Sequence, residues 1–275
     1  MKFTPQQKEF FDVFGFLHFP GLLKDSVGWI LEEFETVFKL HSIFHEETKR
    51  TMCPVTFVDQ TTKFCTLLDD PRICSIAAGV MGPDFQYEGG DGNFYSGDSQ
   101  WHSDTIQEIG FYKHVLHVKF AFYLEPLTRS TGAIRVIPGS HLPKDRFTEG
   151  LAHCIYEGGL PGHEIPALAV ETNPGDLIIF NHNLKHASFG GGKRRRMFTM
   201  NMCANPVTPE ERAEVRKEFE FYGGSGAEKM HSEIMMRIAS PERLKHLEPI
   251  RQFEEGMAAV ARAKKAAKAA TLQPA

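Results

Sequence analysis

The chain has 275 residues, of which 41% are hydrophobic and 24% are charged, and its formal net charge is −4. This length suffices for one large domain with a buried core. The slight negative charge gives no general attraction to nucleic acid or to anionic membranes. We expect no signal peptide and no membrane span. The five cysteines are scattered without a CxxC pair, which argues against a zinc site or a disulfide framework and favours a cytoplasmic location.

The first 80 residues have mainly helical patterns. Thr4-Pro5-Gln6-Gln7 is a capping box with proline at the first helical position, and it predicts a helix that begins there. Residues 15–20 predict a short strand that ends at a proline. A second helix is expected over about 25–45, because hydrophobic residues recur on one helical face.

The pattern of residue types changes between about residues 84 and 205, where short runs of strand-forming residues alternate with turn residues. Asn173-Pro174-Gly175-Asp176 is a strong turn signal. Six runs predict strands, at 93–95, 115–124, 133–137, 167–170, 176–180 and 195–202. This pattern is typical of an antiparallel sandwich or barrel, so we expect a mainly β fold with flanking helices.

Beyond residue 206 the pattern becomes helical again. Residues 210–219 and about 227–239 have helical patterning, and they are followed by an Ala- and Lys-rich tail at 257–275. We expect this tail to be frayed or disordered. The sequence therefore predicts a single domain over residues 1–256, followed by the tail.

A His-x-Asp motif stands at His102 and Asp104. On an extended segment, side chains two positions apart point to the same side, so this imidazole and carboxylate can face one ion. His186, which follows a strand-like run, can supply a third ligand. Two histidines and one carboxylate form a facial triad that leaves three positions for a bidentate 2-oxo acid and O₂. Taken alone, each histidine is more commonly a core or surface residue, and His-x-Asp is a weak signal.

A basic cluster follows His186 and includes Arg194, Arg195 and Arg196. An enzyme that uses 2-oxoglutarate needs a fixed cation for the distal carboxylate, and the arginine guanidinium binds a carboxylate with two parallel hydrogen bonds. The alternative is a solvated basic turn. Because side chains alternate along a strand, at least one of the three arginines is expected to point away from any site.

Four motifs in the chain occur in a characteristic order. The first is Trp101-His102-Ser103-Asp104, which is similar to W-H-x-D, and the second is the stretch 131–141, which is similar to N-G-x-L-x-x-x-P-G-S-H. The third is Asn173-Pro174-Gly175-Asp176, which is similar to a G-D turn, and the fourth is His186-Ala187-Ser188, which is similar to H-G-S. Together they make residues 10–201 resemble the phytanoyl-CoA dioxygenase superfamily of Fe(II)/2-oxoglutarate-dependent oxygenases. Phe14 departs from the pattern, because an aspartate usually precedes the glycine there.

The resemblance implies a double-stranded β-helix, or jelly roll, with Fe(II), 2-oxoglutarate and O₂ as cofactor and co-substrates and with ascorbate as a stimulant. It places the metal on His102, Asp104 and His186. Arg195 best matches the arginine that binds the distal carboxylate of 2-oxoglutarate, although the shorter loop leaves Arg194 and Arg196 open. Two further residues match co-substrate contacts of the superfamily, namely Ser188 and Asn93. Related halogenases replace the carboxylate ligand with a small residue, so Asp104 favours oxygenation over halogenation.

Residues 114–124 alternate between two faces, and the resemblance places the face with Lys119 inside the barrel. A buried lysine needs an anionic partner, and we expect Lys119 to bind either 2-oxoglutarate or an acidic group of the substrate. The segment 144–166 is predicted to be a long loop that serves as a lid. Five further residues are candidate substrate contacts at the mouth of the site, namely Tyr95, Gln100, His117, Arg135 and His182.

These interpretations lead to an enzyme that hydroxylates a C–H bond of a small polar or anionic metabolite and releases succinate and CO₂. No catalytic residue beyond the metal ligands is required, and the chain is expected to be a monomer or a homodimer. Two alternatives remain at this point. One is a metal-dependent cupin-type enzyme that does not use 2-oxoglutarate, and the other is a non-catalytic jelly-roll binding protein.

Overall fold

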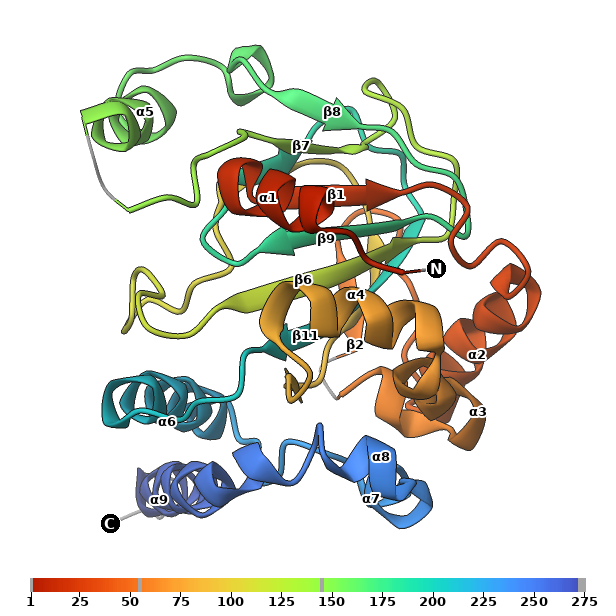
Figure 1. Ribbon diagram of the computed structural model, residues 1–275, viewed down its shortest axis with the longest axis vertical. Helices are drawn as coiled ribbons and strands as arrows, with labels where there is room; N and C mark the ends of the chain where they lie inside the picture. The colour runs from red at the N-terminus through yellow and green to blue at the C-terminus, as the bar shows by residue number, and fades with distance from the viewer. Residues whose placement is uncertain (1, 54–55, 144–145, 272–275) are drawn as a thin grey trace.

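The computed structural model of the chain describes residues 2–53, 56–143 and 146–271. Its centre is a pair of facing antiparallel β-sheets flanked by helices (Figure 1). The large sheet has the strand order β1-β9-β6-β11-β4-β2, and β3 pairs with β11. Its strands are β1 Phe16–Phe19, β2 Thr51–Cys53, β3 Gln86–Tyr87, β4 Gly92–Tyr95, β6 His117–Tyr123, β9 Leu177–Asn181 and β11 Arg195–Cys203.

The small sheet has the order β5-β10-β7-β8. Its strands are β5 Ser99–His102, β7 Ile134–Val136, β8 Leu168–Val170 and β10 His186–Ser188. A cluster of buried hydrophobic side chains from both sheets fills the space between them, including Ala121, Ile134, Ile178 and Met197. The structure therefore confirms the predicted jelly roll, because two sheets share one inner core.

Strand β6 shows how the sequence pattern positions the two sides of the large sheet. Val118, Phe120 and Phe122 face the helices and belong to the main hydrophobic core. Lys119 and Tyr123 alternate with them and line a pocket between the sheets. The polar face of this strand therefore points into the barrel, as the resemblance implied.

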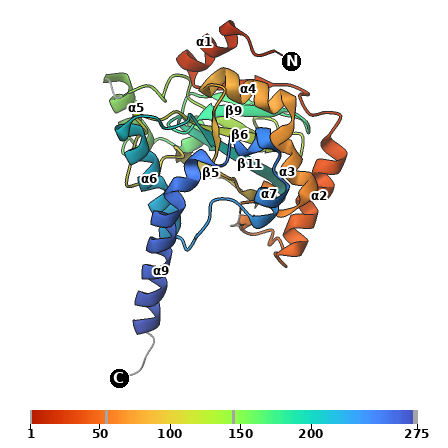
Figure 2. The same cartoon turned by 60° about the horizontal axis from the view of Figure 1, so that its bottom comes forward.

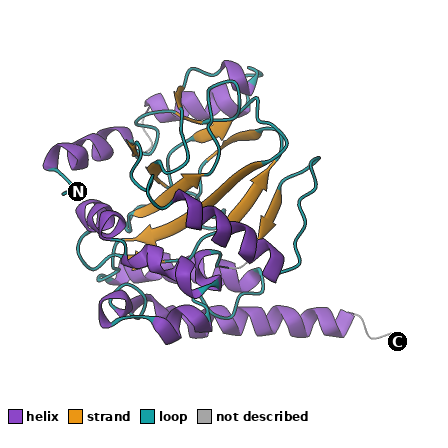
Figure 3. Cartoon of the chain, turned by 90° about the vertical axis from the view of Figure 1, so that its right-hand side faces the viewer, coloured by secondary structure: helices purple, strands orange, loops and turns teal. Residues whose placement is uncertain are grey.

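The N-terminal helices cover the outer face of the large sheet. They are α1 Pro5–Phe14, α2 Val27–Leu40, α3 Thr62–Cys65 and α4 Pro71–Met81, with 3₁₀ turns at Val58–Gln60 and Thr66–Asp69. Thr4 forms the predicted capping box with Gln7. Helix α2 buries Ile30, Phe34, Val37 and Phe38, which confirms the predicted apolar face. Figure 3 shows these helices and the C-terminal ones flanking the strands.

The aromatic residues of this core pack in a continuous group. The ring of Phe198 on β11 stacks on Phe122 at 4.5 Å between centroids and meets the Phe64 ring edge-on at 5.1 Å. We expect Phe198→Ala to lower the free energy of unfolding by about 3–5 kcal/mol, because it leaves a cavity in a packed core. Urea denaturation measures this change. The control is Phe44→Ala, at a phenylalanine that is 84% exposed, and a comparable loss there would contradict the packing argument.

The C-terminal part of the chain forms a helical layer beside the barrel. It contains α6 Pro209–Gly224, α7 Glu233–Ile238, α8 Pro241–Leu244, a 3₁₀ turn at Pro249–Phe253 and α9 Glu254–Thr271. The predicted frayed tail at 257–275 is therefore a helix as far as Thr271, and residues 272–275 lie outside the described residues. Figure 2 shows the end of α9 projecting beyond the rest of the molecule.

Helix α9 forms because its Ala- and Lys-rich sequence favours a helix and because part of one face is buried against α6. Met257 and Ala261, one helical turn apart, are 0% and 5% exposed. Gly223 of α6 lies so close to α9 that a Cβ atom there would collide with the Met257 carbonyl. Alanine has a small apolar side chain, so the buried face of α9 does not appear as a hydrophobic pattern in the sequence.

The segment 144–166 differs from the predicted long loop. It contains helix α5 Arg146–Tyr156 and a 3₁₀ turn at Gly162–Glu164, and residues 144–145 lie outside the described part. Leu151 and Ile155 pack beside Trp101 and Phe189 on the outer face of the small sheet. Only two apolar residues at helical spacing make this contact, too few to predict the helix from the pattern.

Among the described residues, no helix is both long and apolar enough to cross a membrane.

Candidate functional site

The two candidate histidine ligands lie on neighbouring strands of the small sheet. Strands β5 and β10 pair antiparallel, and His102 stands directly opposite His186. Residues opposite each other in such a pair have side chains on the same face, and the two imidazole centroids are 4.2 Å apart. Asp104 follows β5, where its backbone N–H donates to the His182 carbonyl at 2.8 Å.

The three side chains converge on one point. Asp104 Oδ1 lies 3.9 Å from His102 Nε2, and Asp104 Oδ2 lies 3.6 Å from His186 Nε2. One potential ligand atom from each of His102, Asp104 and His186 lies within 4.8 Å of the others. A metal ion bound at about 2.0–2.2 Å to imidazole nitrogen and carboxylate oxygen fits between atoms at these separations.

Both imidazoles present the correct nitrogen to a metal. His102 Nδ1 lies 2.6 Å from the Gln100 carbonyl, and His186 Nδ1 lies 2.9 Å from the Leu184 carbonyl. Each Nδ1–H therefore donates a hydrogen bond to a backbone carbonyl and leaves the Nε2 lone pair free, as in most histidine ligands of metals. Burial lowers the pKa of His186 to about 4, so its ring is neutral at pH 7.

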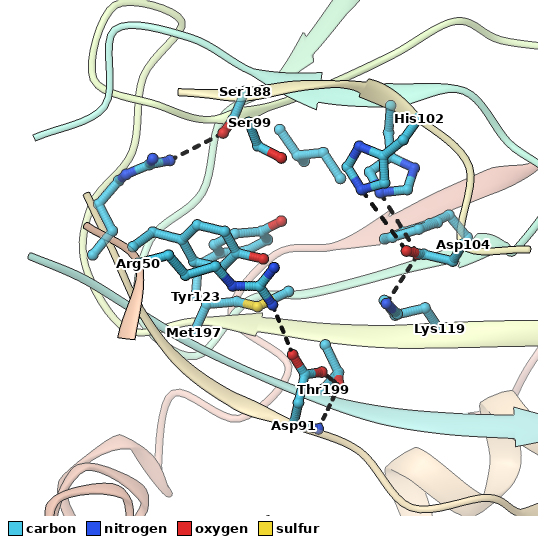
Figure 4. Close-up of a pocket in the computed structure, with 15 residues that line it drawn as sticks. Arg50, Asp91, Ser99, His102, Asp104, Lys119, Tyr123, Ser188, Met197 and Thr199 are labelled. Carbon is cyan, nitrogen blue, oxygen red and sulfur yellow. Dashed lines mark hydrogen bonds and ion pairs between the residues drawn. The ribbon is translucent and has the colours of Figure 1, made fainter. Parts of the chain in front are cut away.

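Lys119 pairs with the carboxylate of Asp104, as Figure 4 shows. Its Nζ lies 2.9 Å from Asp104 Oδ2, and both side chains are largely buried. Burial by itself would raise the pKa of Asp104, but the charge of Lys119 and the neighbouring histidines lower it well below its usual range. The carboxylate is therefore ionised and available as a ligand at neutral pH.

Arg195 lies on β11, which also lines the pocket. It is 6% exposed, and its Nη1 donates to the Gly132 carbonyl at 2.8 Å and to Ser188 Oγ at 3.2 Å. Its Nη2 donates to the Gly97 carbonyl, whereas its Nε has no hydrogen-bond partner among the residues that the structure describes. Within the described ranges no acidic side chain forms an ion pair with Arg195. A buried cation held in this way is suited to an anionic ligand.

The two neighbouring arginines point to the other side of the strand. Arg194 and Arg196 both form ion pairs with Glu35, and Arg196 also pairs with Glu125. The alternation along β11 therefore leaves Arg195 as the arginine of this cluster that lines the pocket.

Asn93 is fully buried on β4 and is engaged by protein groups. Its Oδ1 accepts a hydrogen bond from Arg50 Nε at 2.7 Å, and its Nδ2 donates to Asp91 Oδ2 at 2.5 Å. Arg50 Nη2 also pairs with Asp91 at 3.1 Å. Asn93 thus supports Arg50 and Asp91, which line the pocket, and is not itself among the pocket-lining residues.

The five candidate substrate contacts separate into three groups. Tyr95 lines the pocket, and Arg50 stacks over its ring at 4.5 Å. Gln100 is exposed, and Arg135 donates to the His163 carbonyl at 2.8 Å and stacks over Phe189 on the outer face of the small sheet. His117 and His182 are buried beyond the pocket, close to α6. Strand parity predicts which face a residue occupies, but it does not predict depth along the barrel.

Several pocket-lining residues were not predicted from the sequence. They are Arg50, Asp91, Ser99, Tyr123, Ile134, Phe180, Met197 and Thr199 (Figure 4). Tyr123, Met197 and Thr199 could have been found by counting in steps of two from Lys119 and Arg195 along their strands. Arg50 precedes β2, and no local pattern indicates that it reaches this pocket.

A model of the phytanoyl-CoA dioxygenase (PhyH) family matches residues 11–197. Among curated proteins, Dioxygenase FUM3 of Gibberella moniliformis (strain M3125 / FGSC 7600) is 25% identical over 150 residues. This match covers 50% of the chain and 45% of FUM3, so the chain spans less than half the length of that relative.

Many solved structures share the fold, and three of them show the extent of the likeness. The non-heme alpha ketoglutarate dependent epimerase SnoN from nogalamycin biosynthesis has a TM-score of 0.56 at 17% identity, covering 74% of this chain and 83% of SnoN. HygX from Streptomyces hygroscopicus, with nickel and 2-oxoglutarate bound, has a TM-score of 0.55 at 17% identity, covering 76% of this chain and 90% of HygX. EctD from S. alaskensis, in a structure with 2-oxoglutarate and 5-hydroxyectoine, has a TM-score of 0.54 at 20% identity, covering 74% of this chain and 77% of EctD.

The family match extends over more than half of the chain. It runs from the last turn of α1 through the paired strands β5 and β10 to Met197 on β11, so it contains the three converging side chains and Arg195. The likeness to the solved structures supports the same jelly-roll architecture. The chain belongs to the phytanoyl-CoA dioxygenase family.

Proposed function

We propose that this protein is an Fe(II)- and 2-oxoglutarate-dependent oxygenase that hydroxylates a small metabolite. The observation that carries the proposal is a single pocket lined by two kinds of binding group. His102, Asp104 and His186 form a facial set of neutral and anionic donors, and Arg195 adds a buried cation without an acidic partner among the described residues. Metal and dicarboxylic acid are the ligands that such a pair of groups recognises.

Each protein group has a definite task in this proposal. Asp104 and the two imidazoles hold Fe(II), and Lys119 keeps the carboxylate ionised and fixed. Arg195 and Ser188 bind the distal carboxylate of 2-oxoglutarate. When bound, the iron supplies the oxidative decarboxylation of 2-oxoglutarate with O₂ and the oxidation of the substrate C–H bond. No side chain is needed as a general acid or base.

The remaining pocket walls suggest the substrate class. Arg50, Asp91 and Thr199 bring charged and hydroxyl groups to one side of the pocket, whereas Phe180 and Met197 are apolar. A small polar or anionic metabolite suits this lining better than a long acyl chain. The solved relatives include an epimerase and a protein with 5-hydroxyectoine bound, so the reaction product must be identified directly.

The decisive experiment is succinate release from 2-oxoglutarate in the presence of Fe(II), ascorbate and a panel of small metabolites. We expect one class of polar or anionic metabolite to raise succinate formation well above the uncoupled rate, with an equal amount of product carrying one added oxygen. Mass spectrometry of the product distinguishes hydroxylation from epimerisation or cyclisation. Metal-dependent turnover without 2-oxoglutarate would refute the proposal and favour a cupin-type enzyme.

The ion pair between Lys119 and Asp104 yields a separate prediction. We expect Lys119→Met to weaken Fe(II) affinity by about 10–100-fold, because partners that orient a metal ligand have effects of this size. Anaerobic Fe(II) titration measures the change. The matched control is Lys185→Met, since Lys185 Nζ lies near the site but bonds to Ser103 and Tyr156. If Lys119→Met changes only the KM of the substrate, Lys119 serves the substrate instead.

A further inference from the structure

A second group of ligand-type side chains is buried between the barrel and helix α6. His117 begins β6, His182 follows β9, Glu88 follows β3, Cys203 ends β11 and Glu218 lies on α6. None of the five side chains is more than 4% exposed. Glutamate side chains are almost never fully buried without partners, so two buried glutamates beside two histidines and a cysteine require an explanation.

His117 is oriented by a carboxylate. Its Nδ1 lies 3.1 Å from Glu88 Oε2, with which it forms a hydrogen bond, and 3.3 Å from Glu218 Oε2. The Tyr112 ring stacks on the imidazole at 4.0 Å. Burial by itself would lower the pKa of His117, but the charges of Glu88 and Glu218 raise it to about 9, so without an ion both ring nitrogens carry a proton at pH 7. A metal ion would replace the proton at Nε2, an atom that has no hydrogen-bond partner in the described part of the chain. A carboxylate behind one imidazole nitrogen and a metal at the other is typical of histidine ligands.

The neighbouring side chains also have polar atoms without partners. Among the described residues, both ring nitrogens of His182 and Glu88 Oε1 have no hydrogen-bond partner, and Glu218 Oε2 has no hydrogen bond beyond its contact with His117 Nδ1 at 3.3 Å. Glu218 Oε1, in contrast, accepts a hydrogen bond from Tyr222 at 3.3 Å. Each buried unsatisfied group costs about 1–3 kcal/mol. Together with His117 Nε2, these atoms come from four segments that meet at one location, so their desolvation cost is concentrated there.

The separations of these atoms suit a bound ion. One ligand atom from each of His117, His182 and Glu218 lies within 4.8 Å of the others, and the same holds for Glu88, His117 and Cys203. A buried water could satisfy some of these atoms, but protonated His117 would then offset only one carboxylate, and burial beside Glu88 raises the pKa of the other, Glu218, to about 7. A divalent cation would satisfy the ligand atoms and stabilise both carboxylates in their ionised form.

We propose that His117, His182 and Glu218 bind a second divalent cation of the zinc type, with Glu88 as the carboxylate that orients His117 and Cys203 as an adjacent donor. Nitrogen, oxygen and sulfur donors together are those that Zn²⁺ accepts. The spacing of the cysteines predicted no zinc site, because the proposed site consists mainly of two histidines and two glutamates from distant segments.

The position of the site indicates a structural role. It joins α6 to β6 and to the segment after β9, and full burial is typical of closed structural metal sites. His182 N–H donates to the His117 carbonyl at 3.0 Å, and the His182 carbonyl accepts from Asp104 N–H at 2.8 Å. The second cation thus stabilises the segment against which the carboxylate ligand Asp104 is held. Glu88 and Tyr222 also line a cavity between the barrel and the C-terminal layer, which provides a route of entry.

The test uses the full chain with the oxygenase ligands removed, so that zinc cannot bind there. We expect His102→Ala/His186→Ala protein, supplied with zinc and freed of loose metal by gel filtration, to retain one zinc per chain by elemental analysis. Adding Glu218→Gln should reduce this to zero. The matched control adds His231→Ala instead, at a histidine that is 3% exposed but outside the cluster, and should retain one zinc.

X-ray absorption at the zinc edge keeps the test decisive if Glu218→Gln does not fold. In the His102→Ala/His186→Ala protein, the spectrum should contain scattering from two imidazole ligands, and chelation should lower the melting temperature. Absence of bound zinc in that protein would overturn the second site while leaving the succinate assay of the proposed function unaffected. Zinc that survives Glu218→Gln in folded protein would also overturn it.

Discussion

Replacing His186 with alanine should abolish substrate-dependent succinate formation. The imidazole is one of three donors and stands opposite His102 on the paired strand. Removal of partners that merely orient a metal ligand costs about 10–100-fold in affinity or activity. The loss of a ligand itself should therefore exceed about 100-fold in turnover. Anaerobic Fe(II) titration and succinate release measure the two effects.

His141→Ala is the matched control for this prediction. His141 is 7% exposed, as is His186, but its Nε2 contacts the Asp12 carbonyl at 3.0 Å and it lies outside the pocket. Iron binding and turnover per folded molecule should be retained. Equal losses in the two variants would show that burial, not ligation, explains the effect, and unchanged turnover in His186→Ala would remove the metal centre from that position.

Arg195→Leu should raise the Kd of 2-oxoglutarate by roughly 30-fold to several thousand-fold, because loss of one partner from a buried charge pair costs about 2–5 kcal/mol. The affinity for Fe(II) should stay nearly unchanged, since Arg195 is not a ligand. Titration of the anaerobic Fe(II) protein with 2-oxoglutarate, followed by visible absorption, measures the Kd.

Arg194→Leu is the control, because Arg194 lies on the opposite face of the same strand and pairs with Glu35 at the surface. Its effect on 2-oxoglutarate binding should be less than about fivefold, in line with a surface ion pair worth at most about 1 kcal/mol. A large effect at Arg194 together with a small one at Arg195 would reverse the assignment within the basic cluster.

The main features of the site can be predicted from local sequence. His102 and Asp104 are two residues apart on an extended segment, so their common direction follows from strand geometry. The order of four short motifs adds His186 and the jelly roll. Arg195 is separated from Arg194 and Arg196 only by strand register, and the pairing of Arg195 with Tyr95 settles that register in the structure.

The rest depends on contacts between distant segments. Arg50 reaches the pocket through Asn93 and Asp91, which lie about forty positions later in the chain, and no periodicity records such a contact. His117 shares a strand face with Lys119 but lies deeper, because α6 covers that end of the barrel and brings Glu218 to it. The helix α9 was missed for a different reason, since Met257 and Ala261 are its buried residues in the described part of the chain, and two such residues make no apolar stripe in the sequence.

The pairing of His102 with His186 across β5 and β10 has a consequence for how the protein matures. Neither strand has both imidazoles, so the two rings become neighbours only after the register between these short strands has formed. In the proposed oxygenase, iron would therefore bind only after the two strands have paired in the correct register. Backbone amides of both strands should exchange with deuterium more slowly once the ion is present, and this protection reports directly on whether a nascent chain has reached its mature state.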